Sequence, residues 1–142
     1  MKTTLPLIIV SGPSGVGKTT IIKELMTRNS ILRESISYTT RDRRIGEVEG
    51  VDYYFISEDQ FHTLNDADYF IETNLYNSNW YGTSLDHLKE IIEDHYIPIL
   101  DIDVNGFIKI KDKINNCSVF ISPENISVLE DRLKRRGGLS EK

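Results

Sequence analysis

Residues 5–25 read LPLIIVSGPSGVGKTTIIKEL, an apolar run followed by a glycine-rich stretch and a second apolar pattern. The run at residues 5–10 has the length and the continuous hydrophobicity of a strand that is buried on both faces. Residues 18–28 repeat apolar side chains at helical spacing, and Asn29 can end this helix. A turn requires fewer than three glycines. The additional glycines indicate a loop whose backbone approaches a bound group closely. The order predicts a buried strand, a ligand-binding loop and a helix.

The glycine-rich loop has a phosphate-binding pattern. Gly12, Gly17, Lys18 and Thr19 complete G-x-x-x-x-G-K-[ST] between the predicted strand and helix. Successive backbone N–H groups and the helix N-terminus form a concave anion site. Lys18 adds a positive charge for the β and γ phosphates, and the Thr19 hydroxyl can ligate Mg²⁺. The loop predicts binding of a nucleoside triphosphate; the alternative is a glycine-rich turn with an incidental lysine.

Composition places the chain among soluble globular proteins. Its 142 residues suffice for one domain, and 39% of them are hydrophobic and 27% charged. A net charge of −5 argues against a general nucleic-acid binder. Cys117 is the single cysteine and cannot form an internal disulfide, which favours a reducing compartment. No apolar stretch approaches the roughly 20 residues of a membrane span. We expect a cytoplasmic protein with neither a nucleic-acid nor a membrane partner.

Further along the chain, predicted strands and helices alternate. Ser57 lies three residues before Gln60, a capping box for a short helix over Phe61 and Leu64. The remaining predictions are β-prone stretches within 69–83, a helix at 84–94, a buried strand at 96–103, a helix at 104–113, a core strand at 117–122 and a helix at 125–136. Strands separated by helices indicate an α/β fold with a parallel sheet, into which the polar, aromatic middle of the chain is inserted.

An arginine-rich segment is the candidate acceptor site. Arg41, Arg43 and Arg44 lie close together in an acidic chain, and arginine can hold a doubly charged phosphate in bidentate fashion. A solvated charge run is the alternative interpretation. Further hydroxyl donors for a phosphate are present at Tyr53, Tyr81 and Thr83.

Three carboxylates follow predicted strands. Glu72 comes after YFI and is either an edge group or a buried acceptor. Asp101 and Asp103 lie at the carboxyl end of a strand, where ligands collect in open α/β sheets. Alternation points these two side chains the same way, so they need a cation or donors nearby. Mg²⁺ with its waters, or the amino groups of a base, would meet that need.

The chain resembles the guanylate kinase family, the nucleoside-monophosphate kinases that make GDP from GMP with ATP and Mg²⁺. The matching pieces are SGPSGVGKTT, SISYTTRDRRIGEVEGVDYYF, FIE, WYGT, ILDID-x-x-G and FISP…LEDRLKRRG, in family order along the chain. The resemblance implies an α/β P-loop fold, a parallel sheet flanked by helices with an inserted mixed α/β GMP-binding lobe. It implies a core at 1–34 and 96–124, the lobe at 35–95 and the start of a lid at 125–142, with part of the C-terminal core missing.

The resemblance also implies the site residues. It assigns GMP binding to Ser37, Arg41, Arg44, Tyr53, Glu72, Tyr81, Thr83 and Asp103. Of these, Ser37, Glu72 and Asp103 would contact the guanine base. It assigns ATP binding to Gly12, Pro13, Ser14, Gly15, Val16, Gly17, Lys18, Thr19, Thr20 and Arg132. Thr19 and Asp101 lie near Mg²⁺, and Lys18, Arg44 and Arg136 carry catalysis. A carboxylate such as Glu72 accepts from both N1–H and the 2-amino group of guanine, a donor pattern that adenine lacks.

The sequence departs from the family pattern at several positions. Arg43 replaces a proline, Thr73 a tryptophan and Trp80 a tyrosine, and the chain stops at Lys142 before a further arginine, an adenine contact and a last strand of the family. We therefore expect slow, Mg²⁺-dependent turnover of GMP and ATP, and a homodimer or aggregation through the uncovered 117–122 strand. The alternatives are a non-catalytic homologue that binds nucleotide or a protein partner, and a kinase for another small acceptor such as a sugar phosphate.

Overall fold

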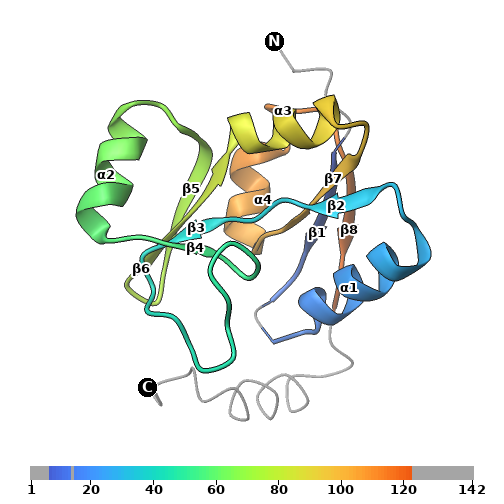
Figure 1. Ribbon diagram of the computed structural model, residues 1–142, viewed down its shortest axis with the longest axis horizontal. Helices are drawn as coiled ribbons and strands as arrows, with labels where there is room; N and C mark the ends of the chain where they lie inside the picture. Colours follow the sequence, from blue (N-terminus) through green and yellow to red (C-terminus); the bar gives the residue numbers. More distant parts are fainter. Residues whose placement is uncertain (1–6, 14, 123–142) are drawn as a thin grey trace.

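The computed structural model describes residues 7–13 and 15–122. In chain order its elements are β1 (Ile8–Ser11), α1 (Lys18–Arg28), β2 (Leu32–Glu34), β3 (Tyr38–Thr39), β4 (Tyr54–Phe55), α2 (Glu58–Asp66), β5 (Phe70–Tyr76), β6 (Asn79–Ser84), α3 (Leu85–Glu93), β7 (Ile97–Asp101), α4 (Val104–Ile110) and β8 (Cys117–Phe120). These elements form two four-stranded sheets (Figure 1). The helix predicted at 125–136 and the lid segment at 125–142 lie outside the described residues.

The first sheet is entirely parallel and has the strand order β2-β7-β1-β8. Side chains of β1 alternate between its two faces, as expected of a strand buried on both sides. Ile9 packs with Leu88 of α3 and Ile110 of α4, whereas Val10 packs with Ile22 of α1. Helices therefore cover both faces of a parallel sheet, which confirms the predicted α/β class.

Helix α1 has the predicted bounds, and its apolar side chains differ in burial. Ile22 is fully buried and Leu25 and Met26 are half-buried against the sheet. Ile21, the apolar residue next to Ile22, is 38% exposed. Each residue turns about 100° around a helix, so the stripe that faces the sheet is centred on Ile22 and leaves its neighbour on the solvent side.

The second sheet has the order β4-β3-β6-β5 and forms most of the inserted mixed α/β lobe. Its strands pair antiparallel except for β3 and β4, which are parallel. The predicted capping box is present, since Ser57 accepts from the Gln60 N–H and the Gln60 side chain accepts from the Ser57 N–H. Phe61 of α2 is completely buried and stacks on Phe70 of β5, with ring centroids 4.6 Å apart. This stacking holds α2 against its sheet.

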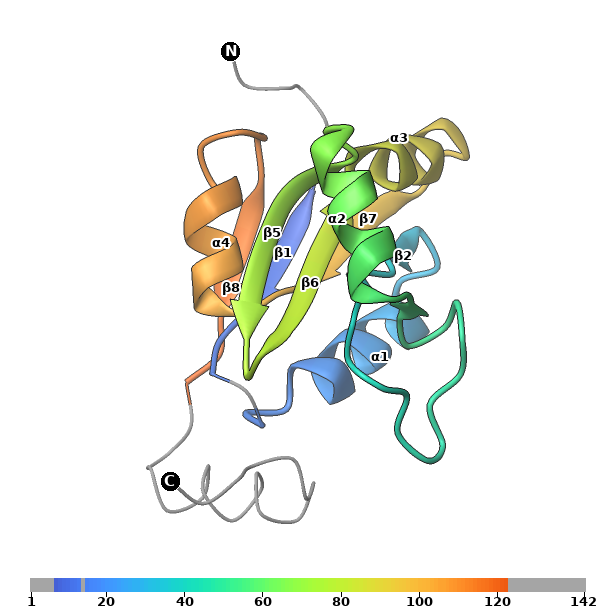
Figure 2. The ribbon, with the colours of Figure 1, turned by 90° about the vertical axis from the view of Figure 1, so that its left-hand side faces the viewer.

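Helix α4 joins the two sheets, because it contacts both β1 and β5 (Figure 2). Ile110 is buried in the core beside Ile9. On the side facing β5, Lys109 Nζ donates to the carbonyl of Thr73 at 2.5 Å and Lys113 Nζ to that of Ile71 at 2.9 Å. The lysines occupy main-chain acceptors of a strand that pairs only with β6 among the described residues. The inserted lobe is thereby fixed to the core.

Strand β8 differs from its prediction as a core strand. It pairs with β1 on one side, and no strand within residues 7–13 and 15–122 pairs with its other side. All four of its residues are exposed, including Val119 and Phe120. The sequence predicted a core strand with an uncovered edge. The strand does end its sheet in the described structure, but its side chains are exposed as well, so the assignment to the core is wrong.

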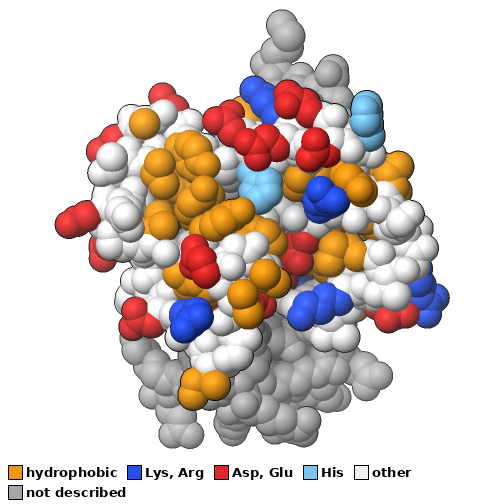
Figure 3. Space-filling view, viewed as in Figure 1, with side chains coloured by type: hydrophobic (Ala, Val, Ile, Leu, Met, Phe, Trp, Pro, Cys, Tyr) orange, Lys and Arg blue, Asp and Glu red, His pale blue; other side chains and the backbone are white. Residues whose placement is uncertain are grey.

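Acidic side chains gather over α3 on the face drawn in Figure 3, where Asp86, Glu90 and Glu93 are exposed. A surface of this sign repels a polyanionic backbone. The prediction that nucleic acid is not a partner is consistent with this face and stays a prediction. Among the described residues, no helix has the length and apolar character needed to cross a membrane.

Candidate active site

The loop between β1 and α1 closes around its own lysine. Gly15 and Gly17 have φ angles of +82° and +103°, which side chains disfavour. Lys18 Nζ donates to the carbonyl oxygens of Gly12 at 2.9 Å and Pro13 at 3.3 Å. These bonds hold the ammonium group at the loop rather than out in solvent. Because Gly17 is the N-cap of α1, the first N–H groups of the helix open beside the lysine.

Gly12 is required by close packing as well as by its φ of +154°. A Cβ at this position would collide with the carbonyl oxygen of Ile121 and lie 3.2 Å from Cγ1 of Val16. The loop is therefore packed against the chain that follows β8. Ser14, which the sequence assigned to the same loop, lies outside the described residues.

A pair of oxygens lies just behind the loop. The Thr19 hydroxyl at the start of α1 donates to Asp101 Oδ2 at the end of β7, at 3.0 Å. The hydroxyl and the carboxylate are both hard oxygen donors, the type that Mg²⁺ prefers. No group of three or more His, Cys, Asp or Glu side chains within the described ranges could hold a metal ion. The pair fits a magnesium ion that keeps its waters and takes further oxygens from substrate phosphates.

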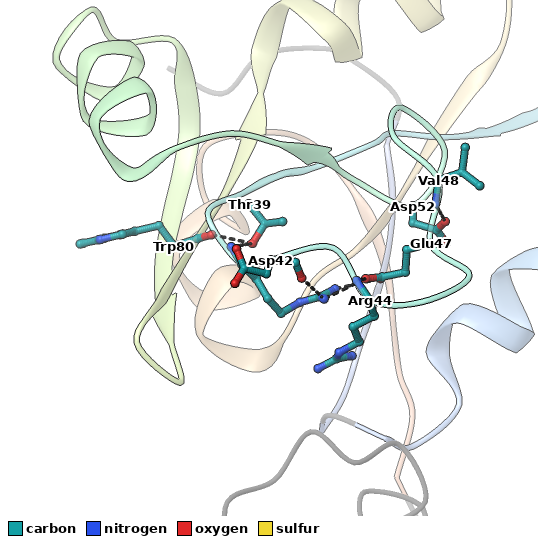
Figure 4. Close-up of polar contacts among 8 residues, drawn as sticks. Thr39, Asp42, Arg44, Glu47, Val48, Asp52 and Trp80 are labelled. Carbon is teal, nitrogen blue, oxygen red and sulfur yellow. Dashed lines mark hydrogen bonds and ion pairs between the residues drawn. The ribbon is translucent and has the colours of Figure 1, made fainter.

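Arg41 is paired with a carboxylate that the sequence analysis did not single out. Its two terminal nitrogens donate to the two oxygens of Glu47, both at 2.8 Å, and the Arg44 N–H donates to Glu47 Oε1 at 2.7 Å (Figure 4). Gly46, with a φ of +89°, turns the chain between them. Hydrogen bonds from Arg41 lower the pKa of Glu47. The sequence signal was the glutamate directly after this glycine, in RDRRIGE.

Two tyrosines complete this corner of the site. The Arg41 guanidinium lies 5.3 Å from the ring centroid of Tyr53, whose ring is 5.9 Å from that of Tyr81. Burial raises the pKa of Tyr53 to about 12, so its hydroxyl stays protonated and able to donate. The three arginines differ in burial: Arg41 is half-buried, while Arg43 and Arg44 are exposed.

Glu72 is a buried carboxylate with one unpartnered oxygen. Its residue is 6% exposed, and Oε1 accepts from the Thr83 hydroxyl at 2.7 Å. Oε2 is buried and has no hydrogen-bond partner among residues 7–13 and 15–122. Desolvation, ahead of the nearby charge of Asp103, raises the pKa of Glu72. The sequence left Glu72 as either an edge group or a buried acceptor, and the buried acceptor is correct. Thr83, expected as a phosphate donor, instead donates to this carboxylate.

Asp103 caps α4 and faces the same region. Its Oδ1 accepts from the Gly106 N–H at 2.8 Å and its Oδ2 from the Asn74 amide at 2.7 Å. Asp101 instead accepts from Thr19. The sequence predicted that these two aspartates share a direction and need a cation or donors; each has found donors of its own. Asn74 was not predicted, because only the tertiary fold brings it to Asp103.

The other predicted residues are less informative. Ser37 is half-buried between β2 and β3, and Thr20 is exposed on α1. Arg132 and Arg136 lie outside the described residues.

Comparison with known proteins gives one family. A sequence model of the family described as guanylate kinase matches residues 4–142. Guanylate kinase of Prochlorococcus marinus subsp. pastoris is 44% identical over 138 residues, which are 96% of this chain and 75% of that protein. Guanylate kinase of Carboxydothermus hydrogenoformans is 44% identical over 132 residues, which are 92% of this chain and 65% of that protein.

A solved structure gives the same result. The crystal structure of guanylate kinase from Anaplasma phagocytophilum matches with a TM-score of 0.73 and 29% sequence identity, over 92% of this chain and 67% of that one. The chain spans 65–75% of the length of these three proteins.

Proposed function

Because the chain belongs to the guanylate kinase family, we propose that it transfers the γ-phosphate of ATP to GMP and releases GDP and ADP. The observation that carries the acceptor assignment is the buried Glu72, whose Oε2 has no partner in the described part of the chain while Oε1 is fixed by Thr83. A buried acceptor without a donor is costly unless a ligand supplies one. N1–H and the 2-amino group of guanine are two adjacent donors of the required kind, and Ser37 is assigned to O6.

The donor nucleotide is assigned to the loop Gly12–Thr20, together with Arg132. Lys18 already lies over the loop carbonyls, where the β and γ phosphates of ATP would exchange with them. Thr19 and Asp101 are the residues that would hold Mg²⁺ and its waters. When bound, the ion neutralises charge on the phosphate oxygens.

The phosphate of GMP is assigned to Arg41, Arg44, Tyr53 and Tyr81. Arg41 and the tyrosines lie within one corner, and the protonated Tyr53 hydroxyl is a donor at any physiological pH. Glu47 holds Arg41 and the Arg44 main chain in place before the substrate arrives. We assign residues 35–95 to the GMP-binding lobe and residues 1–34 and 96–124 to the core.

Phosphoryl transfer requires alignment and charge neutralisation more than a side-chain base. The acceptor is already a phosphate oxygen, so no proton has to be removed from carbon or from an alcohol. Lys18, Arg44 and Arg136 are the cations we assign to the transferring group, and each stabilises charge that spreads over its oxygens.

We place this activity in purine nucleotide metabolism in the cytoplasm. The exposed β8 edge favours a homodimer, which light scattering would show as twice the chain mass; a monomer at high concentration would contradict it.

A coupled assay of ADP formation with saturating GMP, ATP and Mg²⁺ tests the function. Wild type should form GDP, and Lys18→Ala should form none above background. Lys23→Ala is the matched control, because Lys23 is exposed on the same helix. Absence of GDP formation by folded wild type would favour the non-catalytic homologue, and equal turnover of a sugar phosphate would favour a different acceptor.

A further inference from the structure

Asn74 is a buried amide that connects the two sheets at the base site. It lies on β5, is 7% exposed and donates from Nδ2 to Asp103 Oδ2 at 2.7 Å. Asp103 belongs to the turn between β7 and α4, 29 residues further along the chain. Hydrogen bonds to a carboxylate are stronger than those between neutral groups and fix its direction. The hydrogen bond from Asn74 therefore fixes the orientation of the Asp103 carboxylate.

The same strand carries Glu72, two residues earlier and so on the same face of β5. The charge of Asp103 acts on Glu72 and disfavours its ionised form. Gly106 lies between the two acids: a Cβ there would come within 3.2 Å of Glu72 Oε2 and 3.4 Å of Asp103 Oδ1. Two carboxylates, a neutral amide and a glycine thus lie close together.

In this group of four residues, the amide sets the orientation of one acid. Asp103 Oδ1 is engaged by the helix N-terminus through the Gly106 N–H, and Oδ2 is engaged by Asn74. A carboxylate oxygen has two acceptor positions, so Oδ2 can accept a second donor. Asp103 is half-buried, which leaves its outer side accessible to a ligand.

We propose that Asn74 is a positioning residue that fixes the Asp103 carboxylate to accept from the 2-amino group of the purine, and thereby adds to discrimination between GMP and IMP. The inference rests on the proposed function. A 2-amino group carries two hydrogens, one for Glu72 and one for Asp103, whereas the hypoxanthine base of IMP carries none. Loss of Asn74 should therefore affect GMP and spare IMP.

Steady-state kinetics with GMP and IMP tests this role in wild type, Asn74→Ala and Thr73→Ala. Thr73 is the control, because its side chain is on the opposite face of the same strand. We expect Asn74→Ala to lower kcat/KM for GMP about tenfold through KM, with kcat retained and IMP changed less than twofold. Thr73→Ala should leave the GMP to IMP ratio unchanged. Asn74→Leu, similar in shape and without a donor, serves the same test if the alanine variant does not fold.

A double variant separates positioning from general damage. In an Asp103→Ala background, Asn74→Ala should change the GMP to IMP ratio no further, because Asn74 acts through Asp103. An equal loss for GMP and IMP, or a retained ratio, would overturn the inference alone. Calorimetry of GMP binding to wild type makes the distinction, since absence of any GMP binding would overturn the proposed function and this inference together.

Discussion

Replacing Glu72 by glutamine should weaken GMP binding while leaving the ligand-free protein at least as stable. The change is nearly isosteric, so the buried space stays filled. Whichever way the amide turns, one of the two acceptor positions becomes a donor. If Nε2 takes the place of Oε2, it faces the donors of guanine; if it turns to Thr83, only one acceptor is left for the base. The charge is lost in either case.

The magnitude follows from the burial of this group. A hydrogen bond to a charged group contributes about 1.5–3 kcal/mol, and a donor facing a donor at a 6% exposed residue has little water to relieve it. We expect GMP binding to weaken by about 2 kcal/mol or more, which is about 30-fold in Kd. ATP binding should be unchanged, because Glu72 lies on β5 of the second sheet, whereas the glycine-rich loop follows β1 of the first.

The effect on stability should have the opposite sign. Burial raises the folded-state pKa of Glu72 above the ordinary value of 4.5, so ionisation of this carboxylate costs free energy of folding at pH 8. Glutamine removes that cost. Isothermal calorimetry with GMP and ATP, and urea unfolding at pH 8, measure the two effects. The control is Glu93→Gln, an exposed carboxylate on α3. An unchanged GMP affinity, or an equal loss of ATP affinity, would refute the assignment.

Three further changes test other parts of the structure. Desolvation raises the pKa of Glu34 from 4.5 to about 7, so wild-type stability should fall as pH rises from 4.5 to 7. In urea unfolding without Mg²⁺, Glu34→Gln should therefore be more stable than wild type by ~1–3 kcal/mol at pH 8 and by little at pH 4.5. Gly12→Ala should abolish ATP binding in calorimetry and lower the melting temperature, because the new Cβ collides with the Ile121 carbonyl; normal ATP affinity would contradict the loop geometry. The lowered pKa of Glu47 predicts that its pairing with Arg41 stabilises the protein above pH 4.5 and that this contribution is lost as pH falls below 4.5. Glu47→Gln should therefore lower the free energy of unfolding by about 1 kcal/mol or less at pH 7 and leave it unchanged at pH 3.

Local signals in the sequence were sufficient for most helices. The bounds of α1 and the capping box of α2 depend on neighbouring residues, so spacing and cap chemistry define them. β2 was missed because it is three residues long and not apolar enough to stand out. The burial of β8 was misjudged because an apolar run does not reveal whether other elements cover its two faces.

The candidate site divides in the same way. The glycine-rich loop is a contiguous motif and could be identified without a structure. Partners from different elements could not, since Thr83 reaches Glu72 across paired strands and Asn74 reaches Asp103 between the sheets. Spacing along one element also misled for Asp101 and Asp103, because the chain leaves the strand between them and begins α4.

The position of β1 in the middle of its sheet has a consequence for synthesis on the ribosome. Ile8 pairs with Ile99 on one side and with Cys117 on the other, so the first strand to emerge waits for neighbours made about a hundred residues later. The second sheet pairs only residues between 38 and 84 and needs no part of β1. Pairings this far apart close slowly and leave apolar chain uncovered meanwhile. The inserted lobe can therefore fold on the nascent chain. The phosphate loop, which directly follows β1, reaches its folded conformation only when β8 has left the exit tunnel.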